Sequence, residues 1–322
     1  MKAMVYENYG PPEVLQLKKV EKPTPGENEV LIKIRATSAT LYDCWVRSAT
    51  APPGFSLIMR LASGVKPKYP ILGTDLAGDV EAVGENVTRL KSGDRVFGFT
   101  GEGMGAYAEY ICLPQEEVAL KPVNASYEEA TAVIQGALTA WHFLRKANIQ
   151  RGQKVLIFGA SGGVGGYAVQ LAKHHLGAEV TGVCSTSKLE YVRSLGADKV
   201  IDYTQEDFTR NGEVYDVIFD TVGKTPVSRT RRSIKKDGWY LLATFSLPMV
   251  IQLMWLWKVR KQNIEMGTLS EDNAEELTFL KELIEAGVIK STIDKTYPLQ
   301  EAAEAHRYVE TGQKMGNVVI TV

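Results

Sequence analysis

Residues 154–166 of this 322-residue chain read Lys-Val-Leu-Ile-Phe-Gly-Ala-Ser-Gly-Gly-Val-Gly-Gly, and this stretch decides the fold. The apolar run at 154–158 is typical of a short strand buried on both faces. A helix is expected next, because apolar residues then repeat on one helical face before Gly177: Val164, Ala168, Leu171, Ala172 and Leu176. A glycine turn between a strand and a helix N-terminus lets a pyrophosphate approach free backbone amides. That context favours a dinucleotide site over a purely structural turn.

The residues after this motif alternate between short apolar runs and helical patterns. We expect a helix from about Ser187 to Leu195. Strands are expected at Glu179–Cys184, Val200–Tyr203, Val214–Phe219, Trp239–Ala243 and Ile264–Gly267. Strands that alternate with helices imply right-handed crossovers, and therefore an α/β fold with a doubly wound parallel sheet.

The two ends of the chain differ from this middle part. Residues 1–123 contain short, often β-branched runs between Gly, Pro and Asn turns, which is typical of a β-barrel or sandwich. From Glu271 the pattern is helical through Ala286 and again at Ala302–Val309, and a strand is expected at Asn317–Val322. Periodicity leaves open whether this tail caps the parallel sheet or returns to the first domain.

The composition indicates a globular protein with a small-molecule partner. Apolar residues make up 44% and charged residues 23%, and the formal net charge is -1. This balance does not favour a nucleic acid or an anionic membrane as partner. Three separated cysteines argue against a disulfide framework, the start shows no signal peptide, and the apolar stretch Pro248–Trp257 is too short for a membrane span. We therefore expect a cytoplasmic protein.

The residues after the second expected strand bear on the choice of cofactor. An NAD-binding protein would place an Asp or Glu about 20 residues after the glycine loop, on the ribose hydroxyls. This chain has Cys-Ser-Thr-Ser-Lys at 184–188, and Glu190 lies one turn into the helix. Ser185 can donate a hydrogen bond and Lys188 a positive charge to a 2′-phosphate, which favours NADPH. The alternative for Lys188 is an ordinary solvated lysine.

Several ordered motifs together resemble one family along essentially the whole chain. They include MKAMVYENYGPPEVLQL at 1–17, PILGTDLAGDVEAVG at 70–84, VLIFGASGGVGGYAVQLAK at 155–173, YDVIFDTVG at 215–223 and GNVVITV at 316–322. On these motifs the chain resembles the zinc-free quinone oxidoreductase (zeta-crystallin-like) branch of the medium-chain dehydrogenase/reductase superfamily. Ala160 departs slightly from the commonest loop, where a first glycine often stands.

The resemblance implies a GroES-like β-barrel catalytic domain at 1–123, rejoined by 270–322, and a Rossmann domain at 124–269. It also implies NADPH in the cleft between the domains and a homodimer formed through the edge of the Rossmann sheet. The cofactor-binding residues that it implies are Ser161, Gly162, Gly163 and Val164 at the pyrophosphate, Ser185, Lys188 and Tyr203 at the 2′-phosphate, Thr139 and Val222 near the nicotinamide, and Asn317 from the tail.

Zinc is not expected. Where the zinc-dependent branch carries a Cys-His pair this chain has Thr40-Leu41, and where that branch carries Gly-His-Glu it has Gly73-Thr74-Asp75. Thr and Leu are not among the usual zinc ligands, and three cysteines cannot form a four-cysteine lobe. Four histidines remain, and we expect them to be exposed or packed rather than metal-bound: His142, His174, His175 and His306.

Catalysis without a metal requires hydrogen-bond donors beside the developing oxyanion. The candidates are Thr40, Tyr42 and Asp43, in a segment that replaces the family's common Asn-Pro-x-Asp. Tyr42 is the best proton donor or carbonyl anchor, with a packed aromatic as the alternative. Asp43 is expected to orient backbone rather than transfer protons. Cys44 is more simply a buried spectator than a nucleophile.

Two apolar segments that look like insertions, 51–61 and Leu247–Trp257, are expected to cover a small hydrophobic electrophile such as a quinone or an α,β-unsaturated ketone. The second segment carries Met249, Met254, Trp255 and Trp257, and it is equally well explained as a core helix, a dimer contact or a membrane-touching segment. Direct hydride transfer from NADPH is the leading interpretation. Enoyl-thioester reduction, zinc-free alcohol dehydrogenation and an NADPH-binding protein with little activity remain alternatives.

Overall fold

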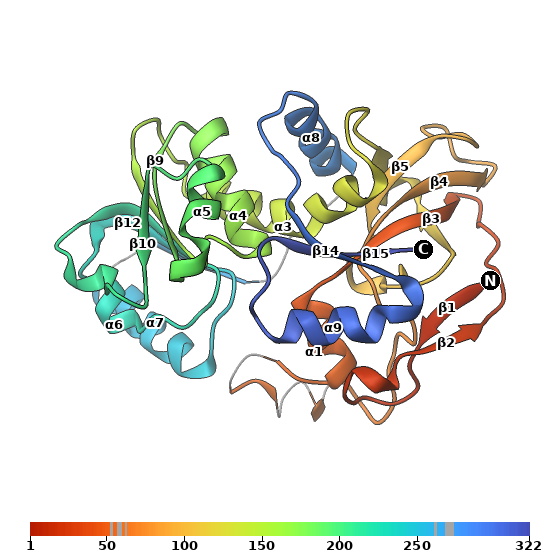
Figure 1. Ribbon diagram of the computed structural model, residues 1–322, viewed down its shortest axis with the longest axis horizontal. Helices are drawn as coiled ribbons and strands as arrows, with labels where there is room; N and C mark the ends of the chain where they lie inside the picture. Colours follow the sequence, from red (N-terminus) through yellow and green to blue (C-terminus); the bar gives the residue numbers. More distant parts are fainter. Residues whose placement is uncertain (52–53, 57–59, 62, 261–262, 268–273) are drawn as a thin grey trace. The chain divides into compact units, whose positions relative to one another are not determined.

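The protein is described by a computed structural model (Figure 1). It describes residues 1–51, 54–56, 60–61, 63–260, 263–267 and 274–322. The chain divides into two compact units. Unit 1 comprises 1–51, 57–138 and 271–322, and unit 2 comprises 52–56 and 139–270.

Unit 2 is a doubly wound parallel sheet, as the sequence predicts. Its strands are β8 (Lys154–Phe158), β9 (Glu179–Cys184), β10 (Lys199–Asp202), β11 (Tyr215–Asp220), β12 (Ile234–Leu242) and β13 (Asn263–Met266). They pair in parallel in the order β10-β9-β8-β11-β12-β13. This is the Rossmann order, in which the chain reverses direction across the sheet between the first and fourth strands. The helices between the strands are α4 (Gly163–Gln170), α5 (Leu189–Ser194), α6 (Val227–Thr230) and α7 (Leu247–Arg260).

Unit 1 is built on a mostly antiparallel sheet. In order, its strands are β14 (Ile293–Pro298), β15 (Asn317–Thr321), β3 (Glu29–Ala39), β4 (Asp75–Val83), β5 (Arg95–Phe99) and β7 (Val118–Leu120), and β6 (Tyr110–Pro114) also pairs with β3. A separate hairpin joins β1 (Lys2–Val5) and β2 (Gln16–Lys19). The helices are α1 (Leu41–Ser48), α8 (Ala274–Glu285) and α9 (Ala302–Glu310).

The tail returns to the first part of the chain, which periodicity alone had left open. β15 pairs antiparallel with β3, with Val318 opposite Ala39. Val318, Val319 and Ile320 are fully buried there, so the tail completes the core of unit 1. The sequence placed the domain boundary at residue 123, whereas the division falls after Leu138, within α3 (Tyr127–Lys146). The difference arises because the first half of α3 packs into unit 1, where Ala132 lies against Ala36 and Val319.

No helix among the described residues is long and apolar enough to cross a bilayer.

Unit 1 buries a carboxylate at the start of β4. Asp75 is 2% exposed, and its Oδ2 accepts a hydrogen bond from Ser38 Oγ. Its backbone oxygen accepts a second bond from Thr37 Oγ1 at 2.6 Å. Burial raises the pKa of Asp75 to about 7, because the carboxylate loses its hydration.

This raised pKa predicts a pH dependence of stability. Between about pH 4 and about pH 7 the folded state keeps a proton on Asp75 that the unfolded state releases, so the free energy of unfolding falls as the pH rises through this range. The slope reaches about 1.4 kcal/mol per pH unit. Asp75→Asn keeps an acceptor for Ser38 and removes this slope. Denaturant unfolding from pH 4 to pH 8 should therefore show the variant gaining stability relative to wild type as the pH rises.

The matched control is Glu85→Gln, an exposed acid shortly after β4, which should follow the wild-type curve. The buried, protonated carboxyl would be contradicted if the free energy of unfolding of Asp75→Asn relative to wild type did not change with pH. It would also be contradicted if the variant lost stability relative to wild type as the pH rises.

Candidate functional site

The turn after β8 packs closely against neighbouring segments. Gly159 has φ +82°, and a Cβ there would lie 2.5 Å from Thr221 Oγ1 and from a Val222 methyl carbon. A Cβ at Gly165 would lie 2.1 Å from the Gly159 carbonyl oxygen. The amides of Gly159 and Ala160 both donate to the Val183 carbonyl oxygen, at 3.0 and 3.1 Å, which fixes the turn to β9. The sequence is therefore glycine at 159 and 165 because no larger side chain fits.

The predicted pyrophosphate residues follow at once. Gly162 is the N-cap of α4 in an extended conformation, and Gly163 and Val164 form the first turn. Amides in the first turn of a helix have no acceptor within the helix and carry the positive end of its dipole. Ser161, which is 8% exposed, immediately precedes them. A glycine-rich loop that ends in such amides fits a bound pyrophosphate.

The residues predicted for the 2′-phosphate meet at the carboxyl ends of β9 and β10. Cys184 pairs with Asp202 across these strands, and the amide of Tyr203 donates to the Cys184 carbonyl oxygen at 3.1 Å. Ser185 and Lys188 begin and end the next turn, where the Lys188 amide donates to the Ser185 carbonyl oxygen at 2.9 Å. The structure thus brings Ser185, Lys188 and Tyr203 to one edge of the sheet.

An acid that the sequence reasoning missed stands beside them. Asp202 Oδ2 accepts from Thr186 Oγ1 at 2.5 Å, and its Oδ1 accepts from the Thr204 amide at 2.9 Å and from Thr204 Oγ1 at 2.7 Å. These hydrogen bonds, that from Thr186 most strongly, hold the pKa of Asp202 below its usual value, so the group is charged. Its position two residues before Thr204 is the signal of an Asx turn. Three donors therefore occupy the carboxylate and fix the loop.

The turn after β11 completes this edge of unit 2. Asp220 Oδ1 accepts from the amides of Val222 at 2.9 Å and Gly223 at 2.8 Å. Burial raises the pKa of Asp220. Thr221 Oγ1 donates to the Phe158 carbonyl oxygen at 2.9 Å, so Val222 is held against the glycine turn. Thr139, also predicted for the nicotinamide half, is half-buried in α3 and belongs to unit 2.

The tail residue predicted to contact the cofactor lies in unit 1. Asn317 opens β15, and its amide nitrogen donates to the Thr292 carbonyl oxygen at 2.8 Å. Its side-chain nitrogen donates to the same oxygen at 3.2 Å. These bonds fix the start of β15, and the role of Asn317 toward a cofactor stays a prediction.

Thr40 and Asp43 form a reciprocal cap at the start of α1. Thr40 Oγ1 accepts from the Asp43 amide at 3.2 Å, and Asp43 Oδ2 accepts from the Thr40 amide at 2.9 Å and from its hydroxyl at 2.6 Å. Asp43 Oδ1 accepts from the Gly73 amide at 3.1 Å. Burial raises the pKa of Asp43 to about 6. Asp43 thus orients the backbone at the start of α1. Tyr42, in the same first turn, is half-buried against the core of unit 1.

Cys44 has a histidine partner that the sequence did not reveal. Its Sγ lies 3.5 Å from His306 Nδ1, and His306 Nε2 lies 3.0 Å from the Tyr107 hydroxyl. All three side chains are almost fully buried. Burial raises the pKa of the Cys44 thiol well above its usual value and lowers that of His306 to about 3. The thiol is therefore protonated and the imidazole neutral, which makes this a packed polar contact rather than an activated nucleophile.

The remaining histidines differ in exposure. His174 and His175 are exposed, while His142 is buried, with its Nε2 3.9 Å from Glu265 Oε1. In the part of the chain that the structure describes, no three His, Cys, Asp or Glu side chains gather as metal ligands.

The two apolar segments meet in unit 2. The ring of Phe55 packs edge-to-face on Phe245, with centroids 5.9 Å apart, and a Cβ at Gly54 would lie 2.6 Å from Leu247 Cβ. Residues 52–53 and 57–59 of the first segment lie outside the described residues. In the second segment Met249 is buried, Met254 and Trp255 are exposed, and the Trp257 side chain lies outside the described part. The core-helix interpretation therefore holds for one face of α7.

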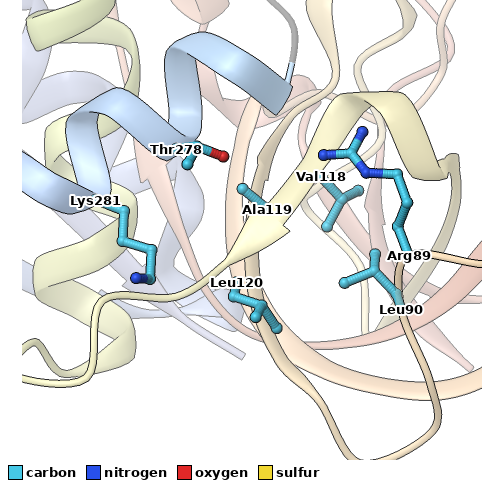
Figure 2. Close-up of a pocket in the computed structure, with 7 residues that line it drawn as sticks. All are labelled: Arg89, Leu90, Val118, Ala119, Leu120, Thr278 and Lys281. Atoms are coloured by element: carbon cyan, nitrogen blue, oxygen red, sulfur yellow. The ribbon is translucent and has the colours of Figure 1, made fainter.

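A pocket in unit 1 contains none of the predicted residues (Figure 2). It lies between β7 and α8, with an apolar floor and with Arg89 and Lys281 at its sides. Lys281 Nζ is already 2.9 Å from Glu285 Oε2. This pocket is therefore separate from the candidate site residues.

Comparisons with known proteins agree with this geometry. Residues 26–123 match the alcohol dehydrogenase GroES-like domain family, and residues 195–320 match the zinc-binding dehydrogenase family. The 2-methylene-furan-3-one reductase of Solanum lycopersicum is 35% identical, over 99% of this chain and 79% of that protein. A quinone oxidoreductase of Pseudomonas aeruginosa is 34% identical over 99% of both chains. The structure of Escherichia coli quinone oxidoreductase complexed with NADPH has a TM-score of 0.86 at 29% identity and covers both chains fully.

The family is established by relatives that match along the whole length of this chain, together with its Rossmann and GroES-like units. The chain is an oxidoreductase that belongs to the medium-chain dehydrogenase/reductase superfamily, in its quinone oxidoreductase branch.

Proposed function

We propose that the protein is an NADPH-dependent, metal-independent reductase of a quinone or an α,β-unsaturated carbonyl compound. The observation that carries the proposal is the edge of unit 2 where Ser185, Lys188 and Tyr203 meet beside the glycine turn. The relatives support the substrate class, because their names describe an enone reductase and a quinone oxidoreductase.

The dinucleotide would lie along the carboxyl edge of the parallel sheet. The first-turn amides at Gly163 and Val164, with Ser161 and Gly162, would take the pyrophosphate. Val222, with Thr139, would lie toward the nicotinamide. When bound, the nicotinamide supplies the hydride, and the chain supplies orientation and polarisation.

The charged groups near the expected 2′-phosphate position favour NADPH over NADH. A 2′-phosphate would gain a charge-assisted hydrogen bond from Lys188 and a neutral one from Ser185. Asp202 stands nearby and is charged, but Thr186 and Thr204 already occupy its oxygens. It is therefore engaged in the loop rather than available to grip ribose hydroxyls, as the acid of an NAD site does.

The chemistry at the substrate requires a donor toward the carbonyl oxygen. The segment at the zinc position supplies Thr40 and Leu41, which are not zinc ligands of the usual kind. Asp43 and Thr40 bond to each other in the cap at the start of α1. The proposed donor that polarises or protonates the oxygen is the hydroxyl of Tyr42, in the same first turn. The paired rings of Phe55 and Phe245 would favour an apolar substrate.

The cytoplasmic location and the homodimer stay predictions of the sequence.

Turnover with a substrate panel tests the proposal. Purified protein should oxidise NADPH in the presence of a quinone or enone, at least about tenfold faster than NADH at equal concentration, because only NADPH uses Lys188. Incubation with a chelator should leave the rate unchanged. Oxidation with enoyl thioesters alone would indicate an enoyl-thioester reductase, and turnover of alcohols with NADP⁺ alone an alcohol dehydrogenase. Tight NADPH binding without oxidation would indicate a non-enzymatic binding protein.

The variant Lys188→Ala tests the proposed contact between Lys188 and the 2′-phosphate of NADPH. Loss of a charge-assisted hydrogen bond should raise the KM for NADPH about 10- to 100-fold and leave the KM for NADH unchanged. Lys199→Ala is the matched control, since Lys199 lies at the opposite end of β10 and pairs with Glu179 at 3.0 Å. Equal losses with both cofactors, or none with either, would rule out contact between Lys188 and the 2′-phosphate.

The variant Tyr42→Phe tests the Tyr42 hydroxyl as the hydrogen-bond or proton donor to the substrate oxygen. Removing the hydroxyl should lower kcat about 100-fold while the KM for NADPH stays within about twofold. Tyr297→Phe, a tyrosine packed on the same core of unit 1, should retain wild-type kinetics. Wild-type kcat in Tyr42→Phe would assign Tyr42 to packing alone.

A further inference from the structure

Most of the exposed side chains that the structure describes on α7 are apolar, and Gln252 and Lys258 are the polar ones. Leu247, Ile251, Met254 and Trp255 are 39%, 65%, 66% and 56% exposed. The opposite face is buried, with Met249 and Leu253 packed in the core of unit 2. A helix that lies on a soluble domain normally shows polar residues on its outer face, and a helix that is apolar all round is normally covered on all sides.

These exposed side chains form one continuous stripe. Their spacing of i, i+4, i+7 and i+8 places them on adjacent turns of the same face. Exposed Lys258 continues the stripe at i+11. We call Leu247, Ile251, Met254 and Trp255 the α7 stripe. Single exposed apolar residues are ordinary, but a contiguous group of four large ones marks an interaction surface.

A basic cluster lies at the end of this stripe. From Lys224 to Lys258 the sequence has seven lysines and arginines against a single acid, in a chain whose net charge is -1. α6 packs against α7 (Figure 1). Along the chain α6 leads into β12 and α7 into β13, and these two strands pair in parallel. The exposed members of the cluster are Lys224, Arg229, Arg232, Lys235, Lys236 and Lys258.

Among the described residues, two members of this cluster form ion pairs. Arg229 lies 3.7 Å from Asp207, and Lys235 lies 2.7 Å from Asp216. With Asp237 of the segment itself, three acids face seven basic residues, so the region keeps a positive excess. A local field of this kind attracts an anionic surface even though the whole chain is close to neutral.

We propose that the α7 stripe and the basic cluster dock the protein on an anionic lipid surface. The stripe would enter the boundary between headgroups and acyl chains, while the lysines and arginines contact the anionic headgroups. Trp255 suits this boundary, because indole combines a large apolar body with a polar N–H, and Lys258 lies one turn beyond it. α7 would lie along the surface and would not span the bilayer.

Charge argues against a second copy of the chain as the occupant. In a two-fold dimer the same patch meets itself, so both protomers would bring positive charge to the interface and neither would supply the opposite charge. Like charges brought together destabilise such an interface. A lipid surface supplies the opposite charge instead.

This proposal goes beyond the proposed reductase activity and stands without it. It concerns residues of unit 2 outside the proposed catalytic and cofactor-binding set, and it takes the membrane-touching alternative for Leu247–Trp257 over the substrate cover. Its readout is binding to vesicles rather than turnover.

Flotation of the full chain with vesicles tests the proposal. Protein should float with phosphatidylcholine vesicles that contain phosphatidylglycerol, should remain in the soluble fraction with phosphatidylcholine alone, and should be released by high salt. Trp255 fluorescence should shift to shorter wavelength on binding, and Trp255→Phe should lose most of that shift. Failure to float on anionic vesicles at low salt would overturn the proposal.

Two variants separate the contributions. Arg232→Glu/Lys236→Glu changes only exposed charges and should weaken binding at least 25-fold, at about fivefold per removed positive charge. Ile251→Gln/Met254→Gln should weaken binding by at least tenfold. Val65→Gln/Val123→Gln alters side chains that are 93% and 86% exposed elsewhere and should bind as wild type. Circular dichroism checks that each variant is folded.

Equal binding by the charge variant and wild type would overturn the proposal. Light scattering gives the other contradicting outcome. A wild type that forms dimers without binding vesicles, together with a monomeric Ile251→Gln/Met254→Gln variant, would assign the α7 stripe to a second copy of the chain.

Discussion

The contact on which unit 2 depends is the approach of the first turn of α4 to the carbonyl oxygen of Gly159. A Cβ at Gly165 would lie 2.1 Å from that oxygen, so the helix can reach the turn only because residue 165 has no side chain. The same turn is tied to β9 by two amides that share the Val183 carbonyl oxygen. Its other side is covered by Thr221 and Val222 from the end of β11. One glycine turn therefore sets the spacing of three strands and points a helix N-terminus at their carboxyl edge.

Much of this arrangement was predictable from the sequence. The strand–turn–helix pattern predicted the parallel sheet, and Glu179–Cys184 was placed with the bounds that the structure has. Local pattern is sufficient there because both faces of each strand are buried and the turn chemistry is specific. The return of the tail was not predictable from periodicity, since a lone apolar strand at 317–322 can join either sheet. Its pairing with β3 depends on contacts across nearly the whole chain.

The polar details of the site were harder to predict, for two physical reasons. Cys44 and His306 are 262 residues apart, and only the packing of α1 against α9 joins them. The apolar spacing of Ala302, Ala305 and Val309 could have placed His306 on the buried face of α9, but it gave no partner. Asp202 is the last residue of β10, whereas an NAD site would have its acid at the end of β9, so a search by spacing along the chain passes over it.

Titration calorimetry with NADP⁺ and, separately, NAD⁺ tests the central claim most directly, because it reports the dinucleotide site of unit 2 without requiring the substrate. The account predicts NADP⁺ binding at least about tenfold tighter, with a difference that narrows at high salt because part of it is charge attraction to Lys188. Equal affinities, or tighter binding of NAD⁺, would contradict the assignment of Ser185, Lys188 and Tyr203 to a 2′-phosphate.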